Sequence, residues 1–138
     1  MRNSFLILFL FCSSLNFAQE GPLGIPKIVV KIPLNETIHL NNVSIKFVEV
    51  LEDSRCPTYI TCVWAGRARV LVELRANNKE SFQKVLLFGE ILTGETKNNV
   101  LFISEENIVS GIDLFPLPTS KVDEERGPFE LMIYIEKK

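Results

Sequence analysis

The chain has 138 residues, of which 46% are hydrophobic and 23% are charged, and its formal net charge is −2. This length accommodates one domain, and the hydrophobic fraction excludes an intrinsically disordered chain. Lysine and arginine total 15 against 17 acidic residues, which argues against a nucleic-acid-binding protein, because such a protein normally carries a basic patch.

Residues 1–18 have the layout of a secretory signal peptide. Arg2 supplies a short positive region, residues 5–12 form an unbroken apolar run, and Ala18 is a small residue at which a signal peptidase could cut. The apolar run is too short to span a bilayer, and no other stretch of the sequence approaches the required length. These features predict a signal peptide over residues 1–18 and no membrane span.

Cys12 raises the alternative of a lipoprotein. A lipid-modified cysteine normally follows small residues, whereas Leu10 and Phe11 precede Cys12. We therefore expect cleavage after Ala18 rather than lipid attachment at Cys12, which leaves an unanchored N-terminus at Gln19. The mature product is expected to be a monomer that is exported to the periplasm or secreted.

The remainder of the chain is patterned as β-strands. Residues 19–26 contain two Gly and two Pro, which predicts an extended lead-in to a domain over residues 27–138. Within that domain apolar and polar residues alternate with a period of two, as is typical of strands with one buried face. The expected strands comprise residues 27–32, 37–40, 43–51, 67–75, 82–88, 100–103, 108–115 and 129–136. Eight short strands without long crossovers favour an all-β fold, either a single antiparallel β-sandwich or a partly open barrel.

Three of these segments also predict details of the core. The alternation in residues 67–75 and 129–136 assigns one set of side chains to the interior: Ala68, Val70, Val72, Leu74, Phe129, Leu131, Ile133 and Ile135. Residues 43–51 alternate as well, but their phase slips by one residue between Phe47 and Val48. A slip of one residue within a strand predicts a β-bulge.

Residues 52–66 contain cysteine, aromatic and arginine residues that the strand pattern does not explain. Cys56 and Cys62 are the only cysteines after the signal peptide, and an even pair in an exported chain predicts a disulfide bond. One interpretation is a structural corner in which Trp64 packs over this disulfide, as in many sandwich cores. The other is a binding surface, because Tyr, Trp and Arg commonly anchor protein interfaces. The candidate contact residues for that surface are Asp53, Arg55, Tyr59, Trp64 and Arg67.

The same segment carries a recognisable motif. Residues 53–57 read D-S-R-C-P, four residues follow, and residues 62–66 read C-V-W-A-G. This pattern resembles the signature of a family of uncharacterised small exported bacterial proteins and lipoproteins. The resemblance covers about a quarter of the chain, since it extends into the strands on either side of the motif. It implies a β-rich fold and a bacterial cell-envelope setting, and it implies no reaction.

Few residues are suited to catalysis or to metal binding. His39 is the only histidine, and it is expected to face solvent from a short strand. One histidine and two disulfide-bonded sulfurs cannot complete a four-ligand zinc site, and the acidic residues 123–125 lack the alternating ligand spacing of a calcium loop. Neither a glycine-rich phosphate loop nor a dinucleotide motif is present in the sequence. We therefore expect no cofactor, no metal and no catalytic residues.

Together these features favour an exported cell-envelope module that works by binding through a disulfide-braced corner. The partner could be an envelope protein, a glycan or an exogenous protein. One alternative is a secreted protease inhibitor, because small β-sandwich inhibitors have this size and present loops from one end. A second alternative is a small hydrolase that uses paired carboxylates, such as Glu52 with Asp53 or Glu105 with Glu106.

Overall fold

The computed structural model describes residues 27–76, 79–119 and 126–138, and in these residues it contains eight strands and no helix. The predicted signal peptide, the lead-in and the acidic residues 123–125 lie outside this part of the chain. The strands are β1 (Lys27–Pro33), β2 (Thr37–Leu40), β3 (Val43–Asp53), β4 (Arg67–Ala76), β5 (Phe82–Gly89), β6 (Val100–Ile103), β7 (Asn107–Phe115) and β8 (Glu130–Lys137). Each begins and ends within two residues of its expected position.

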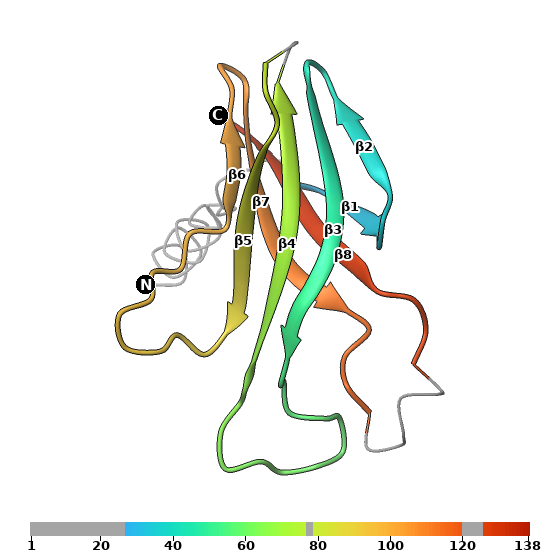
Figure 1. The fold of residues 1–138 in the computed structure, drawn as a ribbon, viewed down its shortest axis with the longest axis vertical. Coiled ribbons are helices and arrows are strands. Elements are labelled where there is room, and N and C mark those ends of the chain that lie inside the picture. The colour runs from blue at the N-terminus through green and yellow to red at the C-terminus, as the bar shows by residue number, and fades with distance from the viewer. Residues whose placement is uncertain (1–26, 77–78, 120–125) are drawn as a thin grey trace, which may run out of the picture.

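The strands form two antiparallel sheets of four strands each. One sheet has the order β1-β8-β7-β6 and the other has the order β2-β3-β4-β5, and the two sheets lie face to face (Figure 1). The predicted all-β sandwich is therefore confirmed, and the two separate sheets exclude the partly open barrel. No helix in the described residues is long and apolar enough to cross a membrane.

The core lies between the sheets and follows the period-two pattern of the sequence. Strand β4 contributes one inward side chain at every second residue, and β8 contributes the opposite wall of the core. The predicted interior residues Ala68, Val70, Val72, Leu74, Leu131 and Ile133 are fully buried or nearly so, and Phe129 and Ile135 pack against them. Burial of such side chains contributes about 1.5–3 kcal/mol each to folding, so the alternation alone accounts for the stacking of the sheets.

The predicted β-bulge is also present in the pairing of β3 with β4. The register shifts between Phe47 and Glu49, as the sequence phase indicates, and it shifts again between Val50 and Glu52. The second shift lets β3 continue past its expected end, because Glu52 then pairs with Arg69 and Asp53 pairs with Ala68. This extension makes Glu52 and Asp53, the start of the cysteine segment, part of the sheet.

The connections divide the molecule into two distinct ends. We call one the loop end: it holds the β3–β4 loop (residues 54–66), the β5–β6 loop (residues 90–99) and the described parts of the β7–β8 connection, at the bottom of Figure 1. We call the other the turn end: it holds the β2–β3 turn (residues 41–42) and the β6–β7 turn (residues 104–106), at the top of Figure 1.

Candidate functional site

The β3–β4 loop is closed by a disulfide bond between Cys56 and Cys62, which confirms the predicted pairing. Their Cα atoms are 5.9 Å apart, and the bond encloses residues 57–61 in a small ring. The Cys56 N–H also donates to the Ala65 carbonyl at 2.8 Å, so the two limbs of the loop are linked twice.

The base of this loop depends on Gly66. Its backbone φ is +70°, and a Cβ atom placed on it would lie 1.9 Å from the Ser54 carbonyl oxygen. Beside this contact, the Ser54 N–H donates to the Arg67 carbonyl at 2.8 Å. Only glycine permits this approach, because any larger residue would push the two limbs apart.

Two of the predicted contact residues, Asp53 and Arg55, face inward and bind each other. The Arg55 guanidinium makes two hydrogen bonds to the Asp53 carboxylate, with N–O distances of 2.8 and 2.9 Å. Their side chains are only 8% and 6% exposed, respectively. This bidentate geometry is the strongest form of an arginine–carboxylate pair. Neither side chain is available to a partner in this conformation.

Arg55 also ties the β3–β4 loop to the end of β7. Its guanidinium donates to the Asp113 carboxylate at 3.3 Å, to the Pro116 carbonyl at 3.0 Å and to the Leu114 carbonyl. Arg126 reaches the other side of Asp53, with 2.6 Å between its nitrogen and the carboxylate oxygen. The result is a buried network that holds two connections of the loop end together.

This network determines the ionisation of Asp53. Burial disfavours the charged carboxylate, but the hydrogen bonds and positive charge of Arg55, with the charge of Arg126, outweigh that effect and lower the pKa of Asp53. Asp53 therefore serves to hold the two guanidinium groups rather than to take part in proton transfer.

Arg67, a third predicted contact residue, is held in a second ionic group nearer the surface. Its Nε lies 2.9 Å from a carboxylate oxygen of Glu52, and its terminal nitrogen lies 2.7 Å from Glu95 in the β5–β6 loop. The hydrogen bond from Arg67 is the main cause of the lowered pKa of Glu52, and it likewise raises the pKa of Arg67. Arg67 thus connects the β3–β4 loop to the β5–β6 loop.

The other two predicted contact residues, Tyr59 and Trp64, are exposed. Tyr59 is 100% exposed and Trp64 is 68% exposed. The prediction that Trp64 packs over the disulfide in a sandwich core is therefore wrong. The loop projects beyond the sheets, so neither sheet can cover its aromatic residues (Figure 1).

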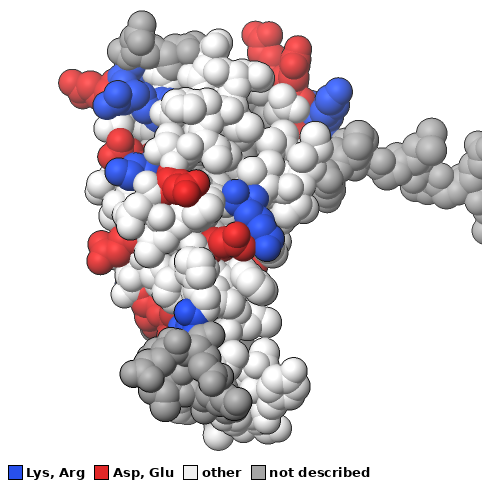
Figure 2. All heavy atoms as spheres, turned by 90° about the vertical axis from the view of Figure 1, so that its right-hand side faces the viewer, with Lys and Arg blue, Asp and Glu red and all other residues white. Residues whose placement is uncertain are grey.

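Two further apolar residues, which were not predicted as contact residues, lie beside them in the loop. Val63 is 95% exposed and Ile60 is half exposed. We call Tyr59, Ile60, Val63 and Trp64 the tip. The sequence feature that could have predicted the tip is that no residue between Arg55 and Arg67 is charged. In Figure 2 the charged side chains are spread over the body of the molecule, and the lowest surface that is not grey is free of them.

Apolar residues of the tip and of the neighbouring loops meet in two hollows, which charged residues also line. Trp64 and Leu92 of the β5–β6 loop line one hollow of about 310 Å³. Cys56 and Leu117 of the β7–β8 connection line a second hollow of about 340 Å³. Exposed apolar residues from three loops therefore share the loop end.

Within the described ranges, the other side chains that could take part in catalysis or metal binding do not converge on a reactive centre. His39 is exposed on β2, as predicted. The carboxylates of Glu52 and Asp53 are both bound to guanidinium groups. Among the described residues there is no group of three or more His, Cys, Asp or Glu side chains that could hold a metal ion.

Comparison of the chain with protein-family models, with curated proteins and with solved structures finds no match.

Proposed function

We propose that the protein is an exported module of the bacterial cell envelope that binds another protein through the tip of its β3–β4 loop. The observation that carries this proposal is the exposure of Tyr59, Ile60, Val63 and Trp64 on a disulfide-closed loop. An exposed apolar cluster costs solubility and contributes little to stability, and such clusters commonly mark interaction sites. Tyr and Trp are also the residues that most often dominate binding energy at protein interfaces.

The backbone of Tyr59 supports the same proposal. Its φ is +70°, in the left-handed region that bulky residues rarely adopt. Tyr59 is entirely exposed, so its ring makes no packing contacts that would offset this strain. Strain that is retained without a packing benefit is typical of functional loops.

The rigidity of the loop favours a protein partner of defined shape. The disulfide, the Cys56–Ala65 hydrogen bond and the 2.8 Å hydrogen bond from the Thr58 N–H to the Pro118 carbonyl fix the tip before binding. A preorganised loop loses little conformational entropy when it binds. The charges at its base are already paired, so a partner need not compensate them.

The decisive experiment compares two variants that each remove exposed aromatic surface. Proteins captured from an envelope extract by the oxidised wild-type protein are purified, and their affinities are measured directly. The Tyr59→Ser/Trp64→Ser variant should bind at least about 30-fold more weakly, because such anchors contribute about 2 kcal/mol or more. The Phe82→Ser variant is the matched control, since Phe82 is an exposed aromatic residue on β5, and it should bind like the wild type.

Equal weakening by both variants, or by neither, would contradict the proposal. Thermal unfolding checks that each variant remains folded. Substitutions at exposed positions normally change stability by less than about 0.5 kcal/mol, so a loss of affinity by the tip variant is not a loss of fold.

We propose inhibition of a protease as the second candidate function. It is supported by the three loops that share the loop end, where Leu92 lines a hollow with Trp64 and Leu117 lines a hollow with Cys56. A disulfide-closed loop with exposed apolar residues suits insertion into a concave substrate cleft. Inhibition assays against cysteine, serine and metallo-proteases test this candidate, and the tip variant should lose any inhibition that the wild type shows.

A further inference from the structure

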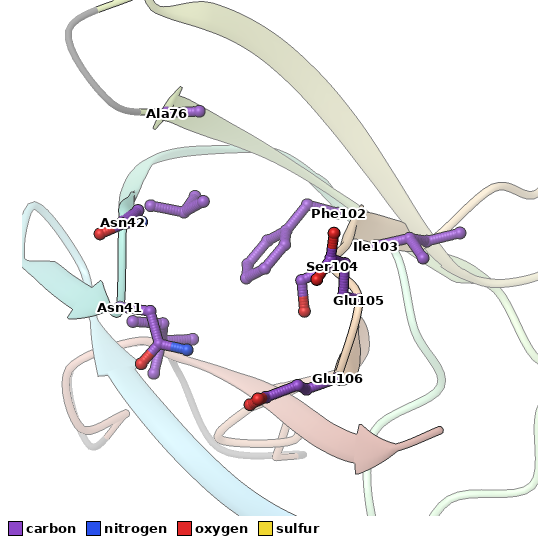
Figure 3. A pocket seen from close by; sticks show the side chains of 10 residues that line it. Asn41, Asn42, Ala76, Phe102, Ile103, Ser104, Glu105 and Glu106 are labelled. Atoms are coloured by element: carbon purple, nitrogen blue, oxygen red, sulfur yellow. The ribbon is translucent and has the colours of Figure 1, made fainter.

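The turn end contains a cavity that the proposed function does not use. It has a volume of about 520 Å³ and opens between the β2–β3 turn and the β6–β7 turn. Pockets for small molecules commonly have volumes of about 300–1,000 Å³. In Figure 3 the ring of Phe102 and the side chain of Glu106 point towards the middle of the cavity, while Asn41 and Asn42 lie across from them.

The inner wall of the cavity is an extension of the hydrophobic core. Leu40, Val43 and Phe102 line the cavity and also pack against the buried core cluster. The two sheets are therefore not sealed at this end, and apolar side chains of the core are accessible from outside. An apolar group of a ligand that entered here would be removed from water on several sides, which is favourable at about 25 cal/mol per Å².

Among the described residues that line the cavity, the charged ones are all acidic. Asn41, Asn42, Glu105 and Glu106 line the cavity, and their side chains make no hydrogen bond or ion pair within the described part of the chain. Lys138 lies nearby and donates its backbone N–H to the Glu106 carbonyl at 2.9 Å. Its ammonium group forms no ion pair with Glu106. Two uncompensated carboxylates beside an apolar cavity favour a positively charged ligand group.

We propose that the turn-end cavity binds a small cationic amphiphile. The apolar part of the ligand lies between the sheets against Leu40, Val43 and Phe102. Its cationic group lies at the opening, within reach of Glu105 and Glu106. The cavity and its apolar wall define the site, and the carboxylates set the preferred charge of the ligand.

The test uses two probes with the same alkyl chain and opposite head groups. Isothermal titration calorimetry is performed with decyltrimethylammonium and with decanesulfonate, both below their micelle concentrations. The wild-type protein should bind one decyltrimethylammonium ion, and it should bind decanesulfonate about tenfold more weakly, which corresponds to about 1.4 kcal/mol of charge discrimination. Equal affinity for the two probes, or no binding of the cation, would overturn the proposal.

Three sets of variants locate the binding. Val43→Trp and Ala76→Met are two independent variants that fill the cavity, and each should abolish binding of the cation. Thermal unfolding measurements show which of the two variants is folded, and a folded variant decides the test. Glu105→Gln/Glu106→Gln should reduce the discrimination between the probes to less than about twofold, because the charge preference arises from these carboxylates. Trp64→Ser changes the opposite end and should leave binding unchanged.

Either of two results would contradict the proposal. If Trp64→Ser abolishes binding and the cavity-filling variants retain it, the alkyl chain binds the exposed tip. If the two Gln substitutions leave the discrimination intact, another group selects the cation.

Discussion

The loop end and the turn end of the sandwich expose different kinds of residue. The loop end exposes uncharged residues, and the turn end exposes carboxylates. At the loop end Asp53, Arg55 and Arg67 are bound to one another or to neighbouring loops, and the uncharged tip is what remains exposed. At the turn end the apolar residues line a cavity, and Glu105 and Glu106 are exposed and form no ion pair with any described residue. Charged residues therefore form ion pairs within the protein at the loop end, whereas at the turn end they are exposed to a ligand. The comparison shows that availability depends on pairing rather than on residue type.

The largest expected effect is the loss of unfolding free energy when Arg55 is removed. Arg55→Met leaves the buried Asp53 carboxylate with one of its two guanidinium partners, and breaking a buried pair in this way costs about 3–5 kcal/mol of unfolding free energy. Glu105→Gln/Glu106→Gln at the turn end removes charges that make no ion pair, and it should change the unfolding free energy by less than about 0.5 kcal/mol. Urea denaturation of both variants measures the difference. Similar small changes in both would mean that the Arg55 network is not what holds the loop end.

The next effect concerns the base of the β3–β4 loop. Gly66→Ala should lower the unfolding free energy by about 3 kcal/mol or more, because it adds a backbone clash to the strain of a positive φ. Gly94→Ala is the matched control: its φ is +89° but nothing lies within 4 Å of the added Cβ. This control should lose only about 1 kcal/mol, the strain alone. Equal losses in urea denaturation would show that the contact with Ser54 is relaxed at no cost.

Removal of the disulfide should have a moderate effect on stability and a larger one on binding. A ring this small contributes about 2 kcal/mol in the chain-entropy description. Cys56→Ser/Cys62→Ser should therefore retain its circular dichroism spectrum and melt at a lower temperature. Because the tip is no longer fixed before binding, its affinity for the captured partner should fall. An unchanged affinity would show that the hydrogen bonds of the loop suffice to order the tip.

The smallest expected effect is the contribution of Asp53 to the pH dependence of stability. The pKa of Asp53 is lowered in the folded protein, so its contribution is present above the ordinary aspartate pKa of about 3.9 and is lost as the pH falls below it. Unfolding free energies measured between pH 7 and pH 2 should decline less steeply for Asp53→Asn than for the wild type. An identical decline in both proteins would contradict the role assigned to the Arg55 network.

Much of the fold follows from local pattern. The alternation in residues 67–75 and 129–136 identifies the buried faces of β4 and β8, and the phase slip at Phe47 identifies a bulge. These inferences succeed because the period of two is a property of the strand itself, and one buried face is needed wherever a sheet packs. The disulfide follows in the same way from the cysteine count.

The candidate site follows only in part. The sequence places Tyr59, Trp64, Asp53, Arg55 and Arg67 together, and their residue types suit an interface equally well. The structure separates them into two exposed aromatic residues and three residues held in ion pairs. Ile60 and Val63 are missed because apolar residues are normally assigned to the interior.

The amino-acid sequence by itself determined the strands, their buried faces, the bulge and the pair of cysteines, because each of these depends on neighbours along the chain. Tertiary structure decided which charges are paired and which apolar residues are exposed. Arg55 bonds to Asp113 and Pro116, and the turn-end cavity joins residues of β2 and β6. These partners are about sixty residues apart in the sequence, so no local period relates them, and only the packing of the two sheets brings them together.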